Sequence, residues 1–296
     1  RVLNSFEQAT EKRNETKDQI TSTLLGQTIY VLILVVLFTL YIALFRTDYF
    51  DKPGSILFLY ALLIIFPIIT SLMIKHNIFS IYIVPFAMAP IFVRVFMDSR
   101  TAFSSYAVTI LLSAVAVRYQ YEFIVVQLVG GLIAIFSLRE LSKRSQIFLT
   151  ALLVTFGSAA IYLALQLIQA DDFSKLDGSM YFHIGVNGFF LLFTYPLMLI
   201  IEKLFGFVST VTMFELSNTN NELLRKLSEV APGTFQHSIT VGNLGVEIAN
   251  KIHAKGQLVR TGALYHDIGK MKNPVFFTEN QGSTNPHDSY SALDSA

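Results

Sequence analysis

Near the C-terminal end of the chain, a histidine and an aspartate stand side by side, and a lysine follows within one turn. These residues are His266, Asp267 and Lys270, and His237 precedes them. Imidazole and carboxylate groups are common ligands of divalent metals, and a carboxylate can bridge two ions. Two ions about 3.5 to 4 Å apart can clamp a phosphate and activate a bridging water, while a lysine neutralises phosphate charge. If these residues form one site, we expect metal-dependent phosphoester chemistry.

A helix must position His237. The Pro232-Gly233 pair predicts a break in the chain, after which Thr234 is placed to cap a new helix by accepting backbone N–H bonds. We expect this helix to run to about Lys251, with His237 in its first turn. Its expected buried side is apolar and consists of Ile239, Val241, Leu244, Val246 and Ile248.

A second helix must bring His266 and Asp267 to the same place. Apolar residues predict this helix from Leu258 to His266, and Gly269 is a natural C-terminal stop. Consecutive residues on a helix point about 100° apart. His266 and Asp267 can therefore hold the same ion, or neighbouring ions, only at a helix end that faces a cleft.

The composition is that of a membrane protein. Hydrophobic residues make up 53% of the 296 residues, charged residues make up 15%, and the mean hydropathy is +0.53, whereas soluble domains carry about a quarter charged residues. A net charge of +1 does not suggest a nucleic-acid partner. The absence of cysteine excludes disulfides, thiolate chemistry and cysteine-ligated zinc, leaving His, Asp and Glu as metal ligands.

Seven apolar runs precede the histidines, and each is within or near the roughly 17 to 25 residues that cross a hydrocarbon core. The third to fifth runs are joined by very short connections, which predict tight helical hairpins or one re-entrant segment. Kinks or local loosening are expected at Pro67, Pro85, Pro90 and Pro196. The runs are Leu24 to Phe45, Ser55 to Ile74, Ile78 to Met97, Thr101 to Val117, Tyr121 to Leu138, Ile147 to Ile168 and Met180 to Ile201.

The basic residues of the short loops predict the orientation in the membrane. With the N-terminus outside, the basic residues of the cytoplasmic turns are Arg46, Lys52, Arg100, Arg139, Lys143 and Arg144. The outer loops then contain Lys75, Arg118 and Lys175. Six basic residues on the inside against three on the outside favour this orientation, and the acidic loop from Asp171 to Asp177 then lies outside, which agrees. An odd number of spans then places the His-Asp pair in the cytoplasm.

The segments outside the runs are polar. We interpret residues 1–23 as the membrane-proximal end of an extracellular domain, with a disordered tail as the alternative. The apolar positions within residues 207–230 predict a helix with one apolar face. This helix either couples the 24–206 region to residues 231–296 or packs on its own domain. The chain starts with Arg1 and stops at Ala296 without a helix-closing signal, so we expect truncation at both ends.

The motif block resembles that of the membrane-bound seven-transmembrane HD-domain phosphohydrolases, a family that includes cyclic di-AMP phosphodiesterases. The resemblance rests on the seven runs and on Leu223-Leu224, Ala231 to Ser238, Tyr265 to Met271 and Phe276 to Gln281. It covers essentially the whole chain. It implies an all-α fold, in which a seven-helix transmembrane bundle is followed by the N-terminal part of an α-helical HD domain.

The same resemblance implies a role for each site residue. His237, His266 and Asp267 would ligate the first of two divalent ions, iron or manganese, and Asp267 would bridge to the second. Lys270 would assist at the phosphate. The implied reaction is metal-dependent hydrolysis of a cyclic dinucleotide, cyclic di-AMP to linear pApA, at a bacterial plasma membrane.

The chain departs from the family pattern in one respect. HD domains supply further histidines and a final aspartate from helices downstream, and this chain ends without them. We interpret His287 as a loop or structural residue. We therefore expect this chain alone not to hold two metals or to turn over substrate, and a metal-to-protein ratio of two would contradict that expectation.

Two other interpretations stay open. One is a seven-transmembrane receptor whose HD remnant binds a nucleotide or a partner without catalysis. Whether the complete protein has downstream His and Asp ligands would discriminate this receptor from an enzyme. The other is a different HD substrate such as cyclic di-GMP, although the Gly-Tyr-Pro motif of that branch is absent here. The expected partners are a cyclic dinucleotide, the lipid bilayer and an unidentified extracellular ligand. A homodimer stays open, and no nucleic acid polymer is expected.

Overall fold

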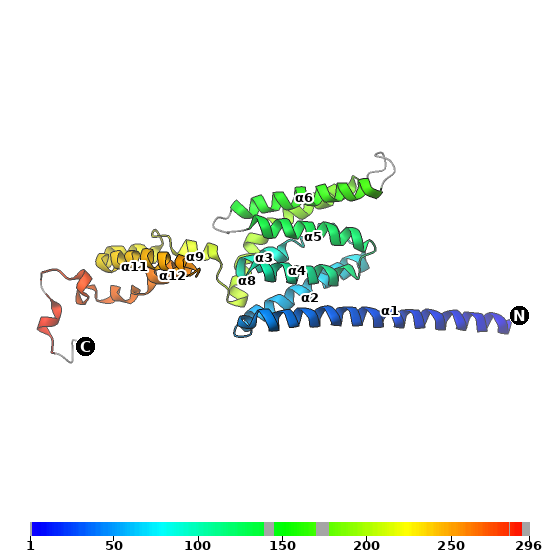
Figure 1. The fold of residues 1–296 in the computed structure, drawn as a ribbon, viewed down its shortest axis with the longest axis horizontal. Helices are drawn as coiled ribbons and strands as arrows, with labels where there is room; N and C mark the ends of the chain where they lie inside the picture. The colour runs from blue at the N-terminus through cyan, green and yellow to red at the C-terminus, as the bar shows by residue number, and fades with distance from the viewer. Residues whose placement is uncertain (1, 139–144, 170–177, 284, 292–296) are drawn as a thin grey trace. The chain divides into compact units, whose positions relative to one another are not determined.

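The structure is a computed structural model that describes residues 2–138, 145–169, 178–283 and 285–291. Every regular element in these ranges is helical, which confirms the predicted all-α fold. The chain divides into two compact units that meet in sequence between Phe207 and Val208 (Figure 1). The basic loop with Arg139, Lys143 and Arg144 and the acidic loop from Asp171 to Asp177 lie outside the described residues.

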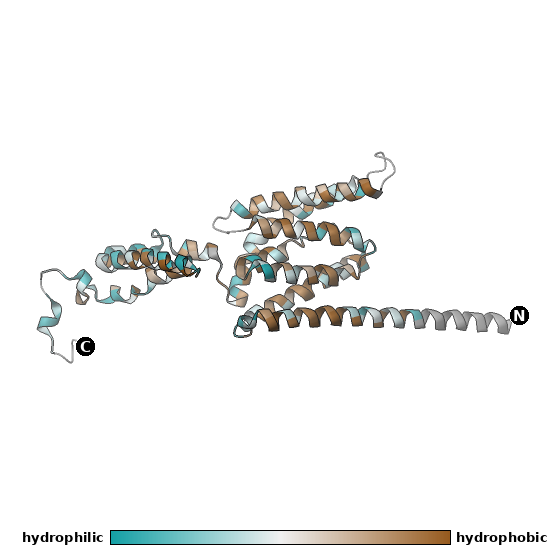
Figure 2. Cartoon of the chain, in the orientation of Figure 1, coloured by the Kyte–Doolittle hydropathy of each residue, from teal (hydrophilic) through white to brown (hydrophobic). Residues whose placement is uncertain are grey.

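The first unit consists of helices that follow the predicted apolar runs in order. Figure 2 shows that apolar residues cover most of their length. The elements are α1 (Val2–Phe45), η1 (Thr47–Tyr49), α2 (Pro53–His76), η2 (Ile81–Ile83), α3 (Met88–Phe96), α4 (Ser99–Ala114), α5 (Gln120–Ser137), α6 (Ser145–Gln169), α7 (Ser179–Leu191) and α8 (Thr194–Phe205).

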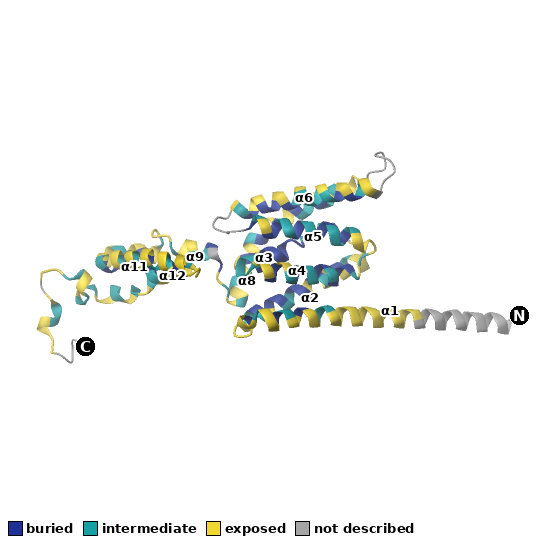
Figure 3. Ribbon diagram, in the orientation of Figure 1, coloured by how far each residue is buried: buried dark blue, intermediate teal, exposed yellow. Residues whose placement is uncertain are grey.

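Four helices of the described part are long and apolar enough to cross a membrane. They are α1 from Gln19 onward, α2, α5 and α6, and the bent pair of α7 and α8 makes a fifth if it is counted as one span. The span in α1 is mostly exposed (Figure 3), with 11% of its most apolar window buried, whereas 28% to 39% of the corresponding windows in α2, α5 and α6 is buried. Such a surface is stable against lipid. The third and fourth runs form shorter helices, so the count of seven spans stays a prediction.

The third run, Ile78 to Met97, is not the continuous helix that its apolar length predicted. It forms η2, then an extended step at Val84, and then α3. Pro85 explains the break, because it lacks an N–H and disfavours the α conformation in the preceding residue. Asn187 of α7 donates hydrogen bonds to the carbonyls of Tyr82 and Val84, at 3.0 and 2.7 Å, which compensates the lost helical bonds.

The last run is also interrupted. A bend of 46° separates α7 from α8, and Pro196 lies in the first turn of α8, which agrees with the predicted kink. Pro67, in contrast, lies inside α2, and that helix continues past it. Proline is tolerated in membrane helices where neighbours satisfy the freed backbone groups.

Close packing inside the first unit depends on small residues. Tyr106 of α4 is fully buried, and its hydroxyl donates a 2.8 Å hydrogen bond to the Gln127 carbonyl of α5. Its ring lies where a Cβ on Gly131 would be, only 1.8 Å from that position. Membrane helices associate largely through such close contacts at small residues, so Gly131 allows α4 to approach α5.

The second unit begins with two helices where one was expected. Residues 207–230 contain α9 (Thr210–Leu216) and α10 (Glu222–Val230), so the prediction of a single helix was wrong. The break has a local cause, because Asn218 and Asn221 accept bonds from the backbone N–H groups of Asn220 and Leu223. Asparagine side chains that bond the nearby backbone favour turns and helix starts. The proposed coupling role is a separate matter and stays a prediction.

The remaining elements of the second unit carry the histidines. They are α11 (Pro232–Lys251), α12 (Gly256–Tyr265), η4 (Ile268–Lys272), η5 (Pro274–Phe276), η6 (Thr278–Asn280) and η7 (Pro286–Ser289). A small core holds α10, α11 and α12 together, and its buried members are Leu224, Leu227, Ala231 and Leu264.

The helix α11 does not bury the side that the sequence predicted. Val241, Leu244 and Ile248 are exposed, with Leu244 at 62%. The face toward α12 is formed instead by small residues, since a Cβ on Gly242 would meet Ala263 and one on Gly245 would meet Val259. Small residues let two helices approach closely, but a search for apolar positions along a helix does not detect glycine and alanine as a packing face.

Candidate metal centre

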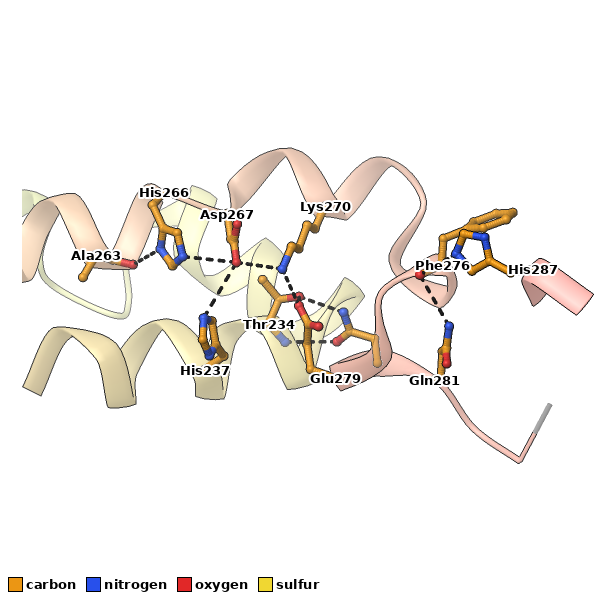
Figure 4. Close-up of polar contacts among 11 residues, drawn as sticks. Thr234, His237, Ala263, His266, Asp267, Lys270, Phe276, Glu279, Gln281 and His287 are labelled. Carbon is orange, nitrogen blue, oxygen red and sulfur yellow. Dashed lines mark hydrogen bonds and ion pairs between the residues drawn. The ribbon is translucent and has the colours of Figure 1, made fainter. Parts of the chain in front are cut away.

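The structure brings together the three residues that were predicted to ligate the first metal. His237 lies in the second turn of α11, His266 follows the last residue of α12, and Asp267 comes next. Their ligand atoms all lie within 4.8 Å of one another. The Nε2 atoms of His237 and His266 are 4.0 and 3.2 Å from the same oxygen, Oδ2 of Asp267 (Figure 4).

The ring of His266 is oriented by the backbone. Its Nδ1 lies 2.8 Å from the carbonyl oxygen of Ala263, one turn back. A carbonyl can only accept, so Nδ1 is the donor in this hydrogen bond, and Nε2 is the ring nitrogen that faces Asp267. This hydrogen bond is the outer-shell partner that metal-ligating histidines usually have.

The chain leaves the α-helix at the point where the metal ligands are needed. Gly269 was expected to end α12, but α12 ends at Tyr265 and Gly269 lies within the 3₁₀-helix η4. In a 3₁₀-helix, side chains three positions apart are nearly eclipsed. Asp267 and Lys270 therefore meet on one side, with Nζ 2.8 Å from Oδ2.

Lys270 connects the three predicted ligands to a second carboxylate. Its Nζ is 2.8 Å from Asp267 Oδ2 and 2.7 Å from Glu279 Oε1. Hydrogen bonds to Asp267 and then Glu279 raise the pKa of Lys270. The hydrogen bond from Lys270 is the main cause that lowers the pKa of Glu279 to about 2. Both groups are therefore charged at neutral pH, and the ammonium is held between the two carboxylates.

The predicted capping role of Thr234 was wrong. The helix α11 starts at Pro232, which suits a first helical position because it has no N–H to leave unpaired. The backbone N–H of Thr234 instead donates to Asn280 Oδ1 at 3.1 Å, and its hydroxyl donates to Glu279 Oε1 at 3.0 Å. No spacing pattern marked Glu279 or Asn280 as site residues, and both appeared only inside the motif from Phe276 to Gln281.

His287 lies apart from this group. It belongs to η7, its Nε2 is 3.0 Å from the carbonyl oxygen of Phe276, and its ring meets the Phe276 ring edge to face. Among the described residues, the candidate metal group contains only His237, His266 and Asp267. The contacts of His287 agree with a structural role.

The arrangement fits one divalent ion. Two imidazoles and one carboxylate leave coordination positions open, and such ligands accommodate iron, manganese or zinc. The side chains of His237 and His266 are 48% and 41% exposed, so an ion and a substrate can reach them. Asp267 has a second oxygen with which it could bridge to another ion.

Fold and site together define a membrane protein with a helical domain that carries a candidate metal site. The family model described as "7TM receptor with intracellular HD hydrolase" matches residues 21–209, and the HD domain model matches residues 234–294. The chain therefore belongs to the family of seven-transmembrane receptors with an intracellular HD hydrolase.

The chain is also similar to curated proteins. It is 35% identical over 219 residues to the cyclic-di-AMP phosphodiesterase PgpH of Bacillus subtilis (strain 168), which covers 71% of this chain and 31% of that protein. It is 36% identical over 225 residues to PgpH of Listeria monocytogenes serotype 1/2a (strain 10403S), with 72% and 30% covered. The chain thus spans about a third of the length of these relatives. No solved structure matches it.

Proposed function

We propose that the complete protein hydrolyses cyclic di-AMP to linear pApA at the metal centre of its HD domain. The observation that carries this proposal is the convergence of His237, His266 and Asp267 on one oxygen, within the region that the HD domain model matches. The relatives in Bacillus and Listeria, which are named cyclic-di-AMP phosphodiesterases, support the choice of substrate.

Each site residue has a role in this proposal. His237 and His266 would hold one divalent ion, iron or manganese, and Asp267 would be shared with a second. Bound ions would supply a hydroxide at neutral pH and would stabilise charge on the phosphate. Lys270 would neutralise a phosphate oxygen, and its ammonium already lies beside Asp267.

The membrane unit would place this domain in the cytoplasm of a bacterium. The excess of basic residues in the predicted inner turns supports that orientation. In support of the loop assignments, Arg46 and Asp98 form an ion pair, so the turn after α1 and the turn before α4 lie at the same end of the first unit. Residues 1–23 would be the end of an extracellular domain, and α9 and α10 would couple the membrane unit to the HD domain.

Hydrolysis assays on the complete protein test the substrate. With added Mn²⁺, the complete protein should convert cyclic di-AMP to pApA and should leave most cyclic di-GMP intact. Preference for cyclic di-GMP would overturn the substrate proposal. Binding of either nucleotide without hydrolysis would favour a receptor whose HD domain does not catalyse.

A further inference from the structure

The Phe276 to Gln281 motif contains a carboxylate that the proposed function leaves without a role. Glu279 lies beside the metal group, yet it is absent from the set of ligand atoms that lie within 4.8 Å of one another. Its Oε1 accepts from Lys270 Nζ at 2.7 Å and from the hydroxyl of Thr234 at 3.0 Å. Glu279 therefore holds the ammonium group of Lys270, which also contacts Asp267 (Figure 4).

The segment that carries Glu279 is fixed to the start of α11. Asn280 accepts from the Thr234 N–H at 3.1 Å and donates to the Thr234 hydroxyl at 2.7 Å. Thr234 is fully buried. The contact is so close that a Cβ on Gly233 would lie 1.7 Å from the Glu279 carbonyl oxygen. Thr234 is three residues before His237 on the same helix, so Glu279 is tied to a metal ligand on one side and to Lys270 on the other.

Lys270 and a metal ion require the same atom. The Asp267 oxygen that Lys270 contacts, Oδ2, is also the one nearest the Nε2 atoms of both histidines. An ion bound by the histidines would take that oxygen, and the ammonium must then yield part of its bond to Asp267. Glu279 offers a second anionic partner, and the Phe277 ring, whose centre is 4.9 Å from Nζ, stabilises the cation further.

We infer that Glu279 is a positioning residue, which holds Lys270 so that Asp267 can accept the metal while the ammonium stays at the phosphate side of the site. This inference rests on the metal centre of the proposed function and assigns a role to a residue that does not ligate the ion. Without Glu279, the ammonium has Asp267 as its remaining carboxylate partner, and an incoming ion must displace a tighter bond.

Manganese affinities of four forms of this chain test the inference: unsubstituted, Glu279→Gln, Lys270→Met and the double variant. Loss of an outer partner typically costs about 10- to 100-fold in metal affinity, so Glu279→Gln should raise the Mn²⁺ Kd by about 10-fold or more. In the Lys270→Met background, where no ammonium competes for Asp267, the same substitution should change the Kd by less than about twofold. Glu247→Gln, at an exposed site further along α11, is the matched control and should leave the Kd unchanged.

The outcomes separate the inference from the proposed function. An equal loss of Mn²⁺ affinity in both backgrounds would mean that Glu279 acts by its charge or its packing alone, and an unchanged Kd in Glu279→Gln would remove its role. Either result overturns the inference about Glu279 and leaves the proposed hydrolase function unaffected. The predicted pattern, together with a complete protein that hydrolyses no cyclic dinucleotide, would keep the inference and overturn the proposed function. A complete protein that binds no Mn²⁺ would overturn the metal centre on which both depend.

Discussion

At the scale of single residues, three side chains and one atom define the site. His237 lies in α11, His266 and Asp267 directly follow α12, and both Nε2 atoms point to Oδ2 of Asp267. The hydrogen bond from His266 Nδ1 to Ala263 leaves Nε2 as the metal-binding nitrogen. These three groups could hold one divalent ion, and Asp267 has a second carboxylate oxygen that could bridge to another.

Removing a ligand should weaken the site more than removing an outer partner does. We expect His237→Ala in this chain to raise the Mn²⁺ Kd by more than about 100-fold, because one of three ligands is lost. Isothermal titration with Mn²⁺ measures this change. His253→Asn is the control, since His253 is exposed and has a positive φ of 56°, which asparagine tolerates. Comparable affinity of His237→Ala and the unsubstituted chain would exclude His237 as a ligand.

The sequence allowed the ligands to be predicted, but not the contacts around them. Short sequence motifs contain the predicted site residues His237, His266, Asp267 and Lys270. The bonds of Glu279 to Lys270 and Thr234 join residues that are distant in sequence or separated by turns, and no periodicity marks them. The meeting of Asp267 and Lys270 depends on the switch from α to 3₁₀ geometry, which the expected stop at Gly269 did not include.

At the scale of elements, α9 is docked on α12 by polar side chains. Gln257, Thr261 and Tyr265 follow one stripe of α12, and each contacts a group at the C-terminal end of α9. The Tyr265 hydroxyl donates to the Leu216 carbonyl at 2.8 Å, and Tyr265 directly precedes His266. The last carbonyls of a helix need such partners, and here they come from the helix that ends at the metal site.

Thr261→Val should loosen this contact. Thr261 is 7% exposed, and its hydroxyl bonds to Ser217 at 2.8 Å and to the Met213 carbonyl at 3.2 Å. Valine removes these contacts, while Ser217 and the Met213 carbonyl keep their bonds to each other and to Gln257. The lost hydrogen bonding is worth about 0.5 to 1.5 kcal/mol, so amide hydrogen exchange in α9 should speed up by about 2-fold or more. Thr240→Val is the control, because the Thr240 hydroxyl is exposed and bonds only within α11. Equal exchange in both variants would show that α9 is not held by Thr261.

Elements with strong patterns were easier to predict than their interruptions. The apolar runs became helices because hydropathy over many residues is a robust signal. Proline predicted kinks at Pro85 and Pro196, but the full break at Pro85 also depends on Asn187, which satisfies the freed carbonyls of Tyr82 and Val84, and a linear sequence does not show such neighbours. The face of α11 that packs on α12 was also set by a neighbouring element, because close approach at Gly242 and Gly245 brings that face to α12 and leaves the apolar side exposed.

At the scale of the whole molecule, an apolar helical unit is followed in one chain by a unit with a metal-binding group. The family match extends over the first unit and the HD match over the second, so each has its own identity. The match covers about a third of the length of the curated relatives. We therefore expect the proposed activity from the complete protein, with its chemistry at Asp267.

The most direct test of this account is Mn²⁺-dependent hydrolysis of cyclic di-AMP by the complete protein and by its Asp267→Ala variant. Asp267 supplies the oxygen that both histidines face, so the variant should lose its bound metal and at least about a thousandfold of its rate, as expected when charge stabilisation at the reacting phosphate disappears. Asp288→Ala, at an exposed site in η7, serves as the control and should keep full activity. Hydrolysis by Asp267→Ala at the rate of the unsubstituted protein would contradict the assignment of the metal centre.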